Sequence, residues 1–216
     1  QSYERGTPTG KVKALGPTRR KGTTIEYRPD PQIFGKKCVY DVDRVRERLE
    51  AKSYLHRGLE VVLKDDASGQ RWELCHPGGI AEYLGKLIAD RGKPAIHAGA
   101  FTLDRADDPR IEIALAWTES PDEKILTYAN GIPTPNGGTH ENGLKAALNK
   151  AVRGFMLQRK IEPKGVTLTA EDIREGLVVL CSVYVREPQF QGQTKDRLNN
   201  PEVAAQVEGA VRTSLE

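Results

Sequence analysis

One apolar run near the C-terminal end of the chain, Leu177 to Val185, constrains the fold most, and only Ser182 interrupts it. A helix that spans a bilayer needs about 20 apolar residues, so this run is far too short to cross a membrane. A shorter run of this kind predicts a buried strand, here over GLVVLCSVYV (176–185). Because no apolar run in the sequence is longer, we expect no membrane-spanning segment and no membrane partner.

The composition predicts a water-soluble chain of one or two domains. Of 216 residues, 33 are Lys or Arg, 30 are Asp or Glu, and 38% are hydrophobic. Three widely spaced cysteines, Cys38, Cys75 and Cys181, favour a reducing compartment over a disulfide framework, so we expect a cytoplasmic location. The chain begins at Gln1 without a signal-peptide-like apolar stretch, and we interpret it as part of a longer protein.

Basic residues are concentrated near the start of the chain. Residues 1–80 hold 16 basic and 11 acidic side chains, whereas residues 81–216 hold 17 and 19. The basic segment KVKALGPTRRKG contributes Lys11, Lys13, Arg19, Arg20 and Lys21. We expect a solvated loop here, and a loop that contacts phosphates is the alternative.

The first 76 residues predict one strand, one helix and one hairpin. TTIEYR (23–28) has β-branched and aromatic residues at strand spacing. Apolar residues recur at helical spacing over residues 41–55, which predicts an amphipathic helix. LEVVLK (59–64) and RWELCH (71–76) flank a polar connector that contains glycine, a pattern typical of a β-hairpin.

We place a domain boundary at PGG (77–79), which separates residues 1–76 from residues 77–216. A helix is predicted after it, because apolar residues recur every three or four positions until GKP (92–94) ends the pattern. The apolar face of this helix consists of Ile80, Leu84, Leu87 and Ile88.

Three strands are predicted next, over AIHAGAF (95–101), RIEIALAW (110–117) and KILTYAN (124–130), and we expect them to pair as antiparallel neighbours. A long helix follows, with Thr139 as its N-cap residue. Its apolar stripe consists of Leu144, Leu148, Val152, Phe155 and Met156.

A short helix over AEDIRE (170–175), the buried strand and a final helix from Asn200 complete the prediction. The apolar side of the final helix carries Val203, Val207 and Val211. No capping residue follows it, so we expect a helix that is truncated at Glu216.

Short motifs for catalysis or metal binding are missing from the sequence. Cys75-His76 is the only adjacent pair of soft metal ligands, and no second pair stands at zinc spacing. Each Gly-Lys pair lacks the Ser or Thr of a Walker-type phosphate loop. Cys181 lies inside the apolar run, where a thiol is normally inert packing. These patterns identify no catalytic residue and no metal ligand.

Two loops keep a functional interpretation. GGTH (137–140) precedes a helix, a position that can bind an anion but more often turns the chain and caps the helix, and its spacing favours the cap. REPQFQGQTKDRLNN (186–200) follows the buried strand and has a polar tip with Gln193 and Lys195. A lysine on a loop anchored by a rigid strand can bind a terminal phosphate, and a solvated lysine is the alternative.

Together these segments resemble a known family. GGTHENGLKAALNKAVRGF (137–155), EDIREGL (171–177) and PQFQGQTKDRLNNPEV (188–203) closely resemble the transducer domain of bacterial type IIA topoisomerase ATPase subunits, which are DNA gyrase B and its counterpart in topoisomerase IV. Upstream, GTTIEYRPDPQIF (22–34) resembles the last strand region of that family's GHKL ATPase domain. The resemblance covers essentially the whole chain.

The resemblance implies an α+β fold in two parts. Residues 1–76 correspond to the C-terminal part of a GHKL ATPase sandwich, and residues 77–216 to a ribosomal protein S5 domain 2-like transducer domain. Transducer domains of this family contain an unusual left-handed β-α-β crossover, whereas such crossovers are normally right-handed.

By the same resemblance, three residues bind ATP. Lys195 corresponds to the lysine of the family's QTK loop, which reaches across a domain interface to the γ-phosphate, and Gln193 to the glutamine beside it. Thr23 corresponds to a threonine of the adenine pocket that also meets aminocoumarin inhibitors. Residues 137–140 match a family signature that we interpret as structural.

The family's catalytic glutamate, Mg²⁺-binding asparagine and glycine-rich lid are expected upstream of Gln1. We therefore expect no catalytic residue and no metal ligand in this chain, and no tightly bound cofactor, whereas the intact subunit uses ATP with Mg²⁺. The fragment itself is expected to be inactive.

The implied function is that of a fragment of the ATPase subunit of a type II DNA topoisomerase, an isomerase. Such a subunit couples ATP binding and hydrolysis to N-gate closure and DNA strand passage. Its implied partners are DNA, the breakage-reunion subunit (gyrase A or topoisomerase IV A) and a second copy in a homodimer. The stretches 51–65, 132–140 and 161–173 look more like topoisomerase IV than gyrase.

Two alternatives belong to other classes. A MutL-type ATPase shares the GHKL and S5-like arrangement, but the GGTH and QTK motifs are not expected together in that family. A non-enzymatic S5-like nucleic-acid-binding module would need a basic face, and the acidic excess of residues 81–216 disfavours it.

Overall fold

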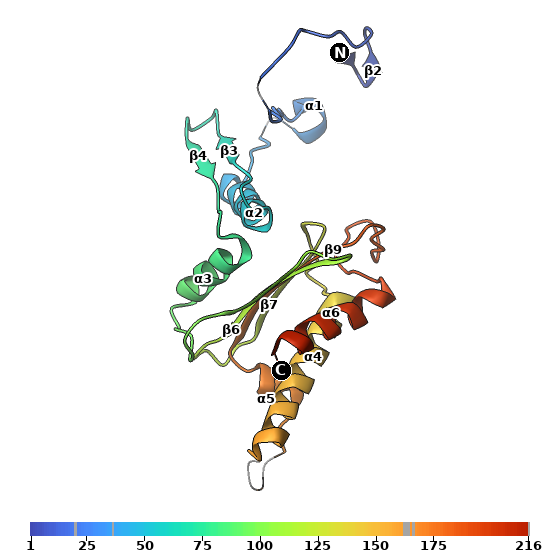
Figure 1. The fold of residues 1–216 in the computed structure, drawn as a ribbon. Helices are drawn as coiled ribbons and strands as arrows, with labels where there is room; N and C mark the ends of the chain where they lie inside the picture. The colour runs from blue at the N-terminus through green and yellow to red at the C-terminus, as the bar shows by residue number, and fades with distance from the viewer. Residues whose placement is uncertain (20, 36, 162–164, 166, 216) are drawn as a thin grey trace. The chain divides into compact units, whose positions relative to one another are not determined.

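A computed structural model describes every residue of the chain except 20, 36, 162–164, 166 and 216 (Figure 1). The chain divides into two units, Gln1–Tyr40 and Asp41–Glu216. Arg20 of the predicted basic loop, Glu216 at the predicted end of the last helix, and part of the stretch 161–173 lie outside the described residues.

The shorter unit contains little regular structure. β1 (Tyr3–Glu4) pairs antiparallel with β2 (Thr7–Pro8), and α1 (Pro31–Phe34) is a single helical turn. The strand predicted over residues 23–28 is wrong, because this segment is exposed and irregular. A strand needs hydrogen bonds from a neighbouring strand, and no described residue pairs with this segment.

The longer unit begins with the predicted helix and hairpin. α2 (Val42–Leu55) is capped by the Asp41 side chain. β3 (Val61–Lys64) and β4 (Arg71–Leu74) form an antiparallel pair. The helix predicted after them is α3 (Gly79–Arg91), which ends at a glycine in the left-handed conformation. All three predictions are confirmed.

Five strands form one sheet in the order β5-β6-β9-β7-β8. Their bounds are β5 (Phe101–Arg105), β6 (Arg110–Trp117), β7 (Lys124–Ala129), β8 (Ile132–Pro133) and β9 (Leu177–Tyr184). β9 confirms the predicted buried strand and lies at the centre, antiparallel to β6 and parallel to β7. The expected direct pairing of β6 with β7 is wrong, because the most apolar strand lies between them, where it is shielded on both edges and both faces.

The strand predicted over residues 95–101 begins only at its last residue. The carbonyl of Gly99 lies 2.8 Å from Nδ1 of His97, and Gly99 has a φ of 75°. A glycine in this left-handed conformation turns the chain and breaks the extended geometry that a strand requires. The prediction is therefore wrong for residues 96–100, and Ala95 forms only an isolated antiparallel bridge with Thr118.

The sheet lies between two layers of helices (Figure 1). One face packs against α4 (Thr139–Arg159) and α6 (Pro201–Leu215), and the other packs against α3. Ile113 of β6 lies on the first face and Ala114 on the second, and both are fully buried. The central strands therefore have two buried faces instead of one buried and one wet face.

α4 is the predicted long helix, but its start and its apolar stripe differ from the prediction. Gly138 is the N-cap residue, and Thr139 is already inside the helix. Leu144 and Leu148 are fully buried. Phe155 is 54% exposed, because the C-terminal half of α4 extends past the sheet (Figure 1). The stripe is thus core only in its first half.

α5 (Ala170–Arg174) and α6 confirm the last two predicted helices. The valines Val203, Val207 and Val211 of α6 are buried. α4 and α5 lie in the connection between the parallel strands β7 and β9, so the unit contains a β-α-β crossover. Among the described residues, no helix combines the length and apolarity needed to span a membrane.

Candidate functional site

The Lys195 loop, residues 186–200, connects β9 to α6. Gln193 and Lys195 are both exposed at its tip. Lys195 has a left-handed backbone with a φ of 60°, and its Nζ lies 5.8 Å from the centre of the Phe190 ring. This conformation is uncommon outside glycine, so the tip is a sharp turn. The two predicted phosphate-binding residues therefore share one exposed turn.

Two backbone hydrogen bonds close the neck of the Lys195 loop. The N–H of Gln191 donates to the carbonyl of Arg197 over 2.9 Å, and the N–H of Asn199 donates to the carbonyl of Gln189 over 2.8 Å. Leu198 between these bonds is fully buried. The two arms of the loop are therefore paired, and only the tip is free of this pairing.

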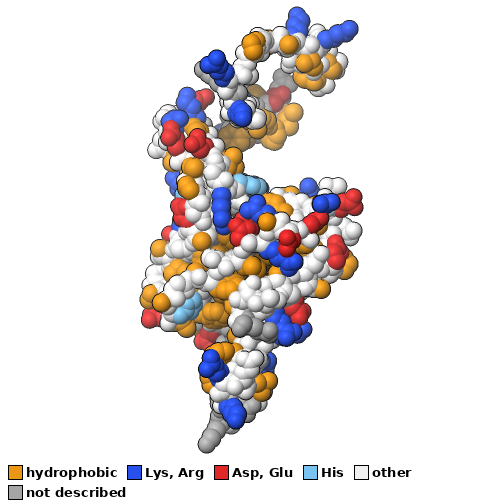
Figure 2. All heavy atoms as spheres, in the orientation of Figure 1, with side chains coloured by type: hydrophobic (Ala, Val, Ile, Leu, Met, Phe, Trp, Pro, Cys, Tyr) orange, Lys and Arg blue, Asp and Glu red, His pale blue; other side chains and the backbone are white. Residues whose placement is uncertain are grey.

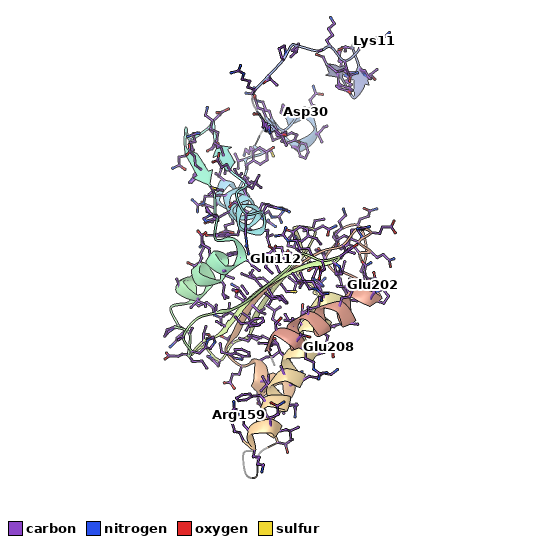
Figure 3. All side chains as sticks on the ribbon, in the orientation of Figure 1. Lys11, Asp30, Glu112, Arg159, Glu202 and Glu208 are labelled. Atoms are coloured by element: carbon purple, nitrogen blue, oxygen red, sulfur yellow. The ribbon has the colours of Figure 1, made fainter. Side chains whose placement is uncertain are left out.

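The side chain of Asn200 joins the two arms below the neck, and Asn200 is 3% exposed. Its Oδ1 accepts a hydrogen bond from the N–H of Gln189 (2.7 Å), while its Nδ2 donates to the carbonyl of Glu187 (3.1 Å) and to Oε1 of Glu202 (2.9 Å). Figure 3 labels Glu202 at the start of α6. A hydrogen bond from its own backbone and then the one from Asn200 lower the pKa of Glu202, which keeps it an anionic acceptor.

The GGTH segment lies against the other side of the Lys195 loop. Leu198 donates its N–H to the carbonyl of Gly137 (3.1 Å), and its carbonyl accepts the N–H of Thr139 (3.0 Å). A Cβ at Gly138 would stand 2.6 Å from the backbone nitrogen of Leu198, so this approach requires glycine. The prediction that Thr139 caps the helix is wrong: the backbone of Leu198 takes the first N–H of α4.

Asn136 adds two contacts beside the tip. Its N–H donates to the carbonyl of Asp196 (2.9 Å), and its carbonyl accepts a hydrogen bond from Nη1 of Arg197 (2.9 Å). Residues 196–199 are thus held between two segments, residues 136–139 on one side and residues 189–191 on the other. The base of the loop is fixed, and its tip projects from this base.

His140, the last residue of the GGTH segment, is fully buried. Its Nε2 lies 3.0 Å from Oγ1 of Thr134, which in turn lies 2.7 Å from Oγ1 of Thr127 on β7. Burial lowers the pKa of His140 to about 4, so the imidazole is neutral at pH 7. The segment is therefore tied to the sheet by uncharged hydrogen bonds, as expected of a structural signature.

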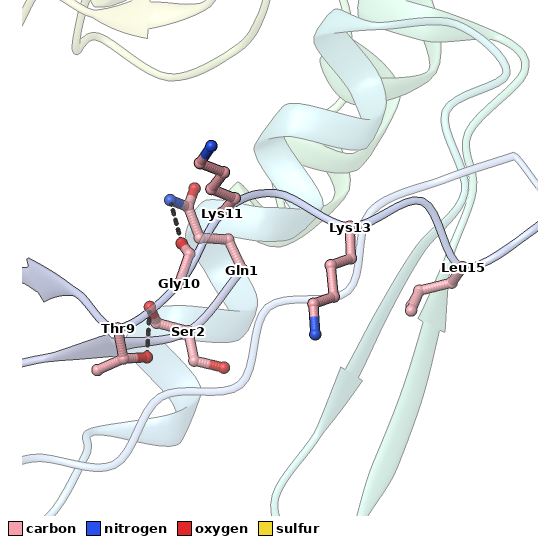
Figure 4. Close-up of a pocket in the computed structure, with 7 residues that line it drawn as sticks. All are labelled: Gln1, Ser2, Thr9, Gly10, Lys11, Lys13 and Leu15. Atoms are coloured by element: carbon pink, nitrogen blue, oxygen red, sulfur yellow. Dashed lines mark hydrogen bonds between the residues drawn. The ribbon is translucent and has the colours of Figure 1, made fainter.

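Thr23, the third predicted ATP-binding residue, is exposed in the unit Gln1–Tyr40, and the contacts described above do not include it. That unit contains an open pocket (Figure 4). Lys11 and Lys13 of the basic segment line it, and the Nε2 of Gln1 donates to the carbonyl of Gly10 across it (3.0 Å). The described part of the basic segment is irregular and exposed, which agrees with the predicted solvated loop.

Sequence reasoning misses one buried carboxylate, that of Glu112 on β6 (Figure 3). Its Oε1 lies 2.6 Å from Nη2 of Arg110 and 4.0 Å from Nη2 of Arg57. Asp104 also pairs with Arg57, at 3.2 Å. A buried charge must be paired, because losing its hydration costs several kcal/mol. In the alternating pattern of RIEIALAW, a glutamate looks like an outward-facing residue, so the sequence contains no signal for this cluster.

The described residues fit a phosphate better than a metal ion. The exposed tip offers the ammonium of Lys195 and the amide of Gln193, and no described carboxylate forms a salt bridge with Lys195. No group of three or more His, Cys, Asp or Glu side chains among the described residues could hold a metal ion. Acidic and basic side chains are interspersed over the face visible in Figure 2. This part of the chain can therefore bind one anionic group at the loop tip.

Comparison with known sequences finds relatives that match this chain over nearly its whole length. The family model of DNA gyrase B matches residues 79–216. The DNA gyrase B protein of Thermotoga maritima is 36% identical over 223 residues, which cover 100% of this chain and 35% of that protein. The gyrase B protein of Streptococcus pneumoniae serotype 4 is 34% identical, covering 94% of this chain and 32% of that protein. The chain thus spans about a third of the length of these relatives.

Comparison with solved structures finds proteins of similar fold. The 43K ATPase domain of Thermus thermophilus gyrase B, in complex with an aminocoumarin, has a TM-score of 0.72 and 32% identity, over 87% of this chain and 50% of that chain. The topoisomerase IV ATP-binding domain of Francisella tularensis has a TM-score of 0.69 and 26% identity, over 84% of this chain and 49% of that chain. These similarities confirm the mixed α and β fold class.

Proposed function

The chain belongs to the DNA gyrase B family, and from this premise we propose that it is the coupling part of the ATPase subunit of a type II DNA topoisomerase. In the intact subunit, it transmits ATP binding and hydrolysis to closure of the N-gate and to DNA strand passage. The observation that carries this proposal is the position of Lys195, which is exposed at the tip of a loop whose base is held from both sides.

In this proposal, Lys195 and Gln193 bind ATP through its γ-phosphate. ATP supplies a negatively charged phosphate group, which suits an ammonium and an amide as hydrogen-bond donors. The ammonium of Lys195 leaves the Phe190 ring and donates to the phosphate, and Gln193 donates beside it. Residues 196–199 are paired with the segment that leads into α4. A displacement of the tip on phosphate binding is therefore transmitted to α4 and α6 and is not absorbed by a flexible loop. Thr23 contributes to the adenine pocket.

We propose that residues 1–76 are the C-terminal part of a GHKL domain and that residues 77–216 are an S5-like transducer domain with a left-handed crossover. The parallel pair β7 and β9, with α4 between them in the chain, supports a β-α-β crossover, and its left hand rests on the family resemblance. The first part also contacts the second: Tyr184 donates its hydroxyl to the carbonyl of Leu55 over 2.9 Å. Such contacts provide a path for movement between the two parts.

The partners follow from the same proposal. They are DNA, a breakage-reunion subunit of the gyrase A or topoisomerase IV A type, and a second copy of the ATPase subunit. ATP acts with Mg²⁺, and we expect the groups that hold Mg²⁺ in other parts of the intact subunit. The free cysteines Cys38, Cys75 and Cys181 support a cytoplasmic location.

Within the family, we propose a topoisomerase IV-type subunit. The support is sequence similarity in the stretches 51–65, 132–140 and 161–173. The curated relatives described above are gyrase B proteins, and the solved structures include both types. The activity of the enzyme reconstituted with its partner subunit distinguishes the two types. Decatenation without supercoiling supports a topoisomerase IV-type subunit, and ATP-dependent negative supercoiling contradicts it.

The test of the main proposal is DNA-stimulated ATP hydrolysis by the full-length subunit with its partner. A charged hydrogen bond contributes about 1.5 to 3 kcal/mol, so Lys195→Ala should lower kcat/KM for ATP by roughly one to two decades. Lys93→Ala, at an exposed lysine between α3 and the sheet, is the matched control and should leave turnover unchanged. Equal turnover of Lys195→Ala and the wild type would rule out a phosphate contact by Lys195.

A further inference from the structure

We propose that Asn200 is a positioning residue for Lys195 and that it acts through the neck of the loop without touching the nucleotide. The inference rests on the proposed function of Lys195 and adds a residue to which the family resemblance assigns no role. Its basis is that one buried side chain, that of Asn200, holds the arm of the loop to which the GGTH segment forms no described hydrogen bond.

The two arms of the loop are held unequally. Residues 196–199 are paired on one side with residues 136–139 and on the other with residues 189–191. Among the described residues, 187–191 have hydrogen bonds only on the second side, through the bonds of Gln191 and Asn199 and the side chain of Asn200, and Phe190 packs against the core. The side-chain hydrogen bonds of Asn200 to the loop therefore act on this arm and not on residues 196–199.

Removal of the Asn200 side chain leaves specific groups without partners. The N–H of Gln189 loses its acceptor, and the carbonyl of Glu187 loses its donor. Loss of these two part-buried hydrogen bonds favours local opening of the arm by roughly tenfold. The freed arm carries Phe190, over whose ring the Nζ of Lys195 lies. Opening of this arm also loosens the paired neck, which positions the tip with Lys195 whether or not the ammonium lies over the ring.

The neighbouring asparagine provides a matched control. Asn199 is exposed, and its backbone N–H forms the neck bond, whereas Asn200 is buried and uses its side chain. Asn199→Ala therefore keeps every hydrogen bond described here, and Asn200→Ala removes three. The two variants make the same chemical change at adjacent positions.

The decisive experiment measures DNA-stimulated ATP hydrolysis by the full-length subunit with its partner in a double-mutant cycle. Asn200→Ala should lower kcat/KM by roughly tenfold and Asn199→Ala by less than about twofold. If Asn200 acts through Lys195, adding Asn200→Ala to Lys195→Ala should cause little further loss, about twofold at most.

Each outcome of the cycle separates the two proposals. Losses that multiply in the double variant, or unchanged turnover of Asn200→Ala, overturn the role of Asn200 while Lys195 keeps its own. Unchanged turnover of Lys195→Ala overturns the proposed function, and the role of Asn200 falls with it. Non-additive losses support both.

Hydrogen exchange on the same full-length proteins separates positioning from general stability. Asn200→Ala should accelerate amide exchange in residues 187–195 by roughly tenfold and leave β9 and α6 at wild-type rates. Faster exchange throughout β9 and α6 would overturn the inference. If Asn200→Ala does not fold, Asn200→Ser serves both experiments, because one shorter hydroxyl cannot replace both Nδ2 donations and the Oδ1 acceptor, and it adds no charge beside Glu202.

Discussion

The backbone N–H of Leu198 donates a hydrogen bond to the carbonyl of Gly137 over 3.1 Å. This bond joins two motifs that are far apart in the sequence, the GGTH segment and the Lys195 loop. The segment is anchored in turn through His140, which hydrogen-bonds with Thr134 in the core. The exposed lysine is therefore connected to the central sheet by a short series of buried contacts.

Gly138→Ala should destabilise the longer unit by about 1–3 kcal/mol. Gly138 has a φ of 140°, and a Cβ there would collide with the backbone of Leu198. Gly154→Ala is the control, because a Cβ at this position in α4 meets nothing within 4 Å. It should stabilise the protein by about 0.5–1 kcal/mol through higher helix propensity. Urea denaturation of both variants measures the difference, and equal stability of the two would contradict the close approach of Gly138 to Leu198.

The three cysteines should differ sharply in reactivity toward a thiol reagent at pH 8. Cys38 and Cys75 are exposed, whereas Cys181 is fully buried in β9. Burial raises the pKa of Cys181 to about 12, so almost none of it is thiolate. Two thiols should react promptly in the folded protein, and the third only after urea is added. Prompt reaction of all three would show that β9 is not the protected centre of the sheet.

Glu112→Ala should cost about 1–3 kcal/mol, because it leaves the guanidinium of Arg110 without its buried partner. The arginine side chain is 44% exposed, and water therefore offsets part of the loss. Glu73→Ala removes a similar pairing with Arg71 at the surface and should change stability by less than about 0.5 kcal/mol. Denaturation midpoints of the two variants compare these cases, and equal midpoints would mean that Glu112 is solvated.

Most elements of the fold follow from periodicity, but the strand order does not. The run 176–185 indicates a buried strand by its apolarity alone, and β9 is that strand. Nothing local shows that β9 inserts between β6 and β7, because that placement depends on contacts between residues far apart in the chain. The segment 23–28 shows the opposite failure: it has strand-like residues, but no strand among the described residues pairs with it.

The candidate site was predictable only in part, for a physical reason. A motif identifies Lys195 and Gln193, because their chemistry lies in exposed side chains. Asn200 and Asn136 act through backbone partners, and such contacts leave no fixed residue pattern in the sequence. Gly138 was predictable only in part. The pair Gly137-Gly138 indicates a turn in the sequence, but it does not indicate the close backbone contact with Leu198 that requires glycine at position 138.

The buried imidazole of His140 should make the protein less stable as the pH falls below 6.5. Burial lowers its pKa in the folded state to about 4, while Glu141 raises the pKa and Arg197 lowers it by smaller amounts. The unfolded state, with a pKa near 6.5, binds the proton first, so stability is fully present above pH 6.5 and is lost toward pH 4. Between pH 7 and pH 5 the loss should be about 2 kcal/mol.

Protonation of carboxylates with a lowered pKa, such as Glu202, also destabilises the folded protein in acid. The contribution of His140 must therefore be measured against a variant that lacks the imidazole. His140→Gln is such a variant, because glutamine keeps hydrogen-bonding groups but does not titrate. The wild type should lose about 2 kcal/mol more than this variant when urea denaturation is repeated at pH 7 and pH 5. An NMR titration gives a direct check, since a ring that titrates near pH 6.5 in the folded protein would show that His140 is not buried against Thr134.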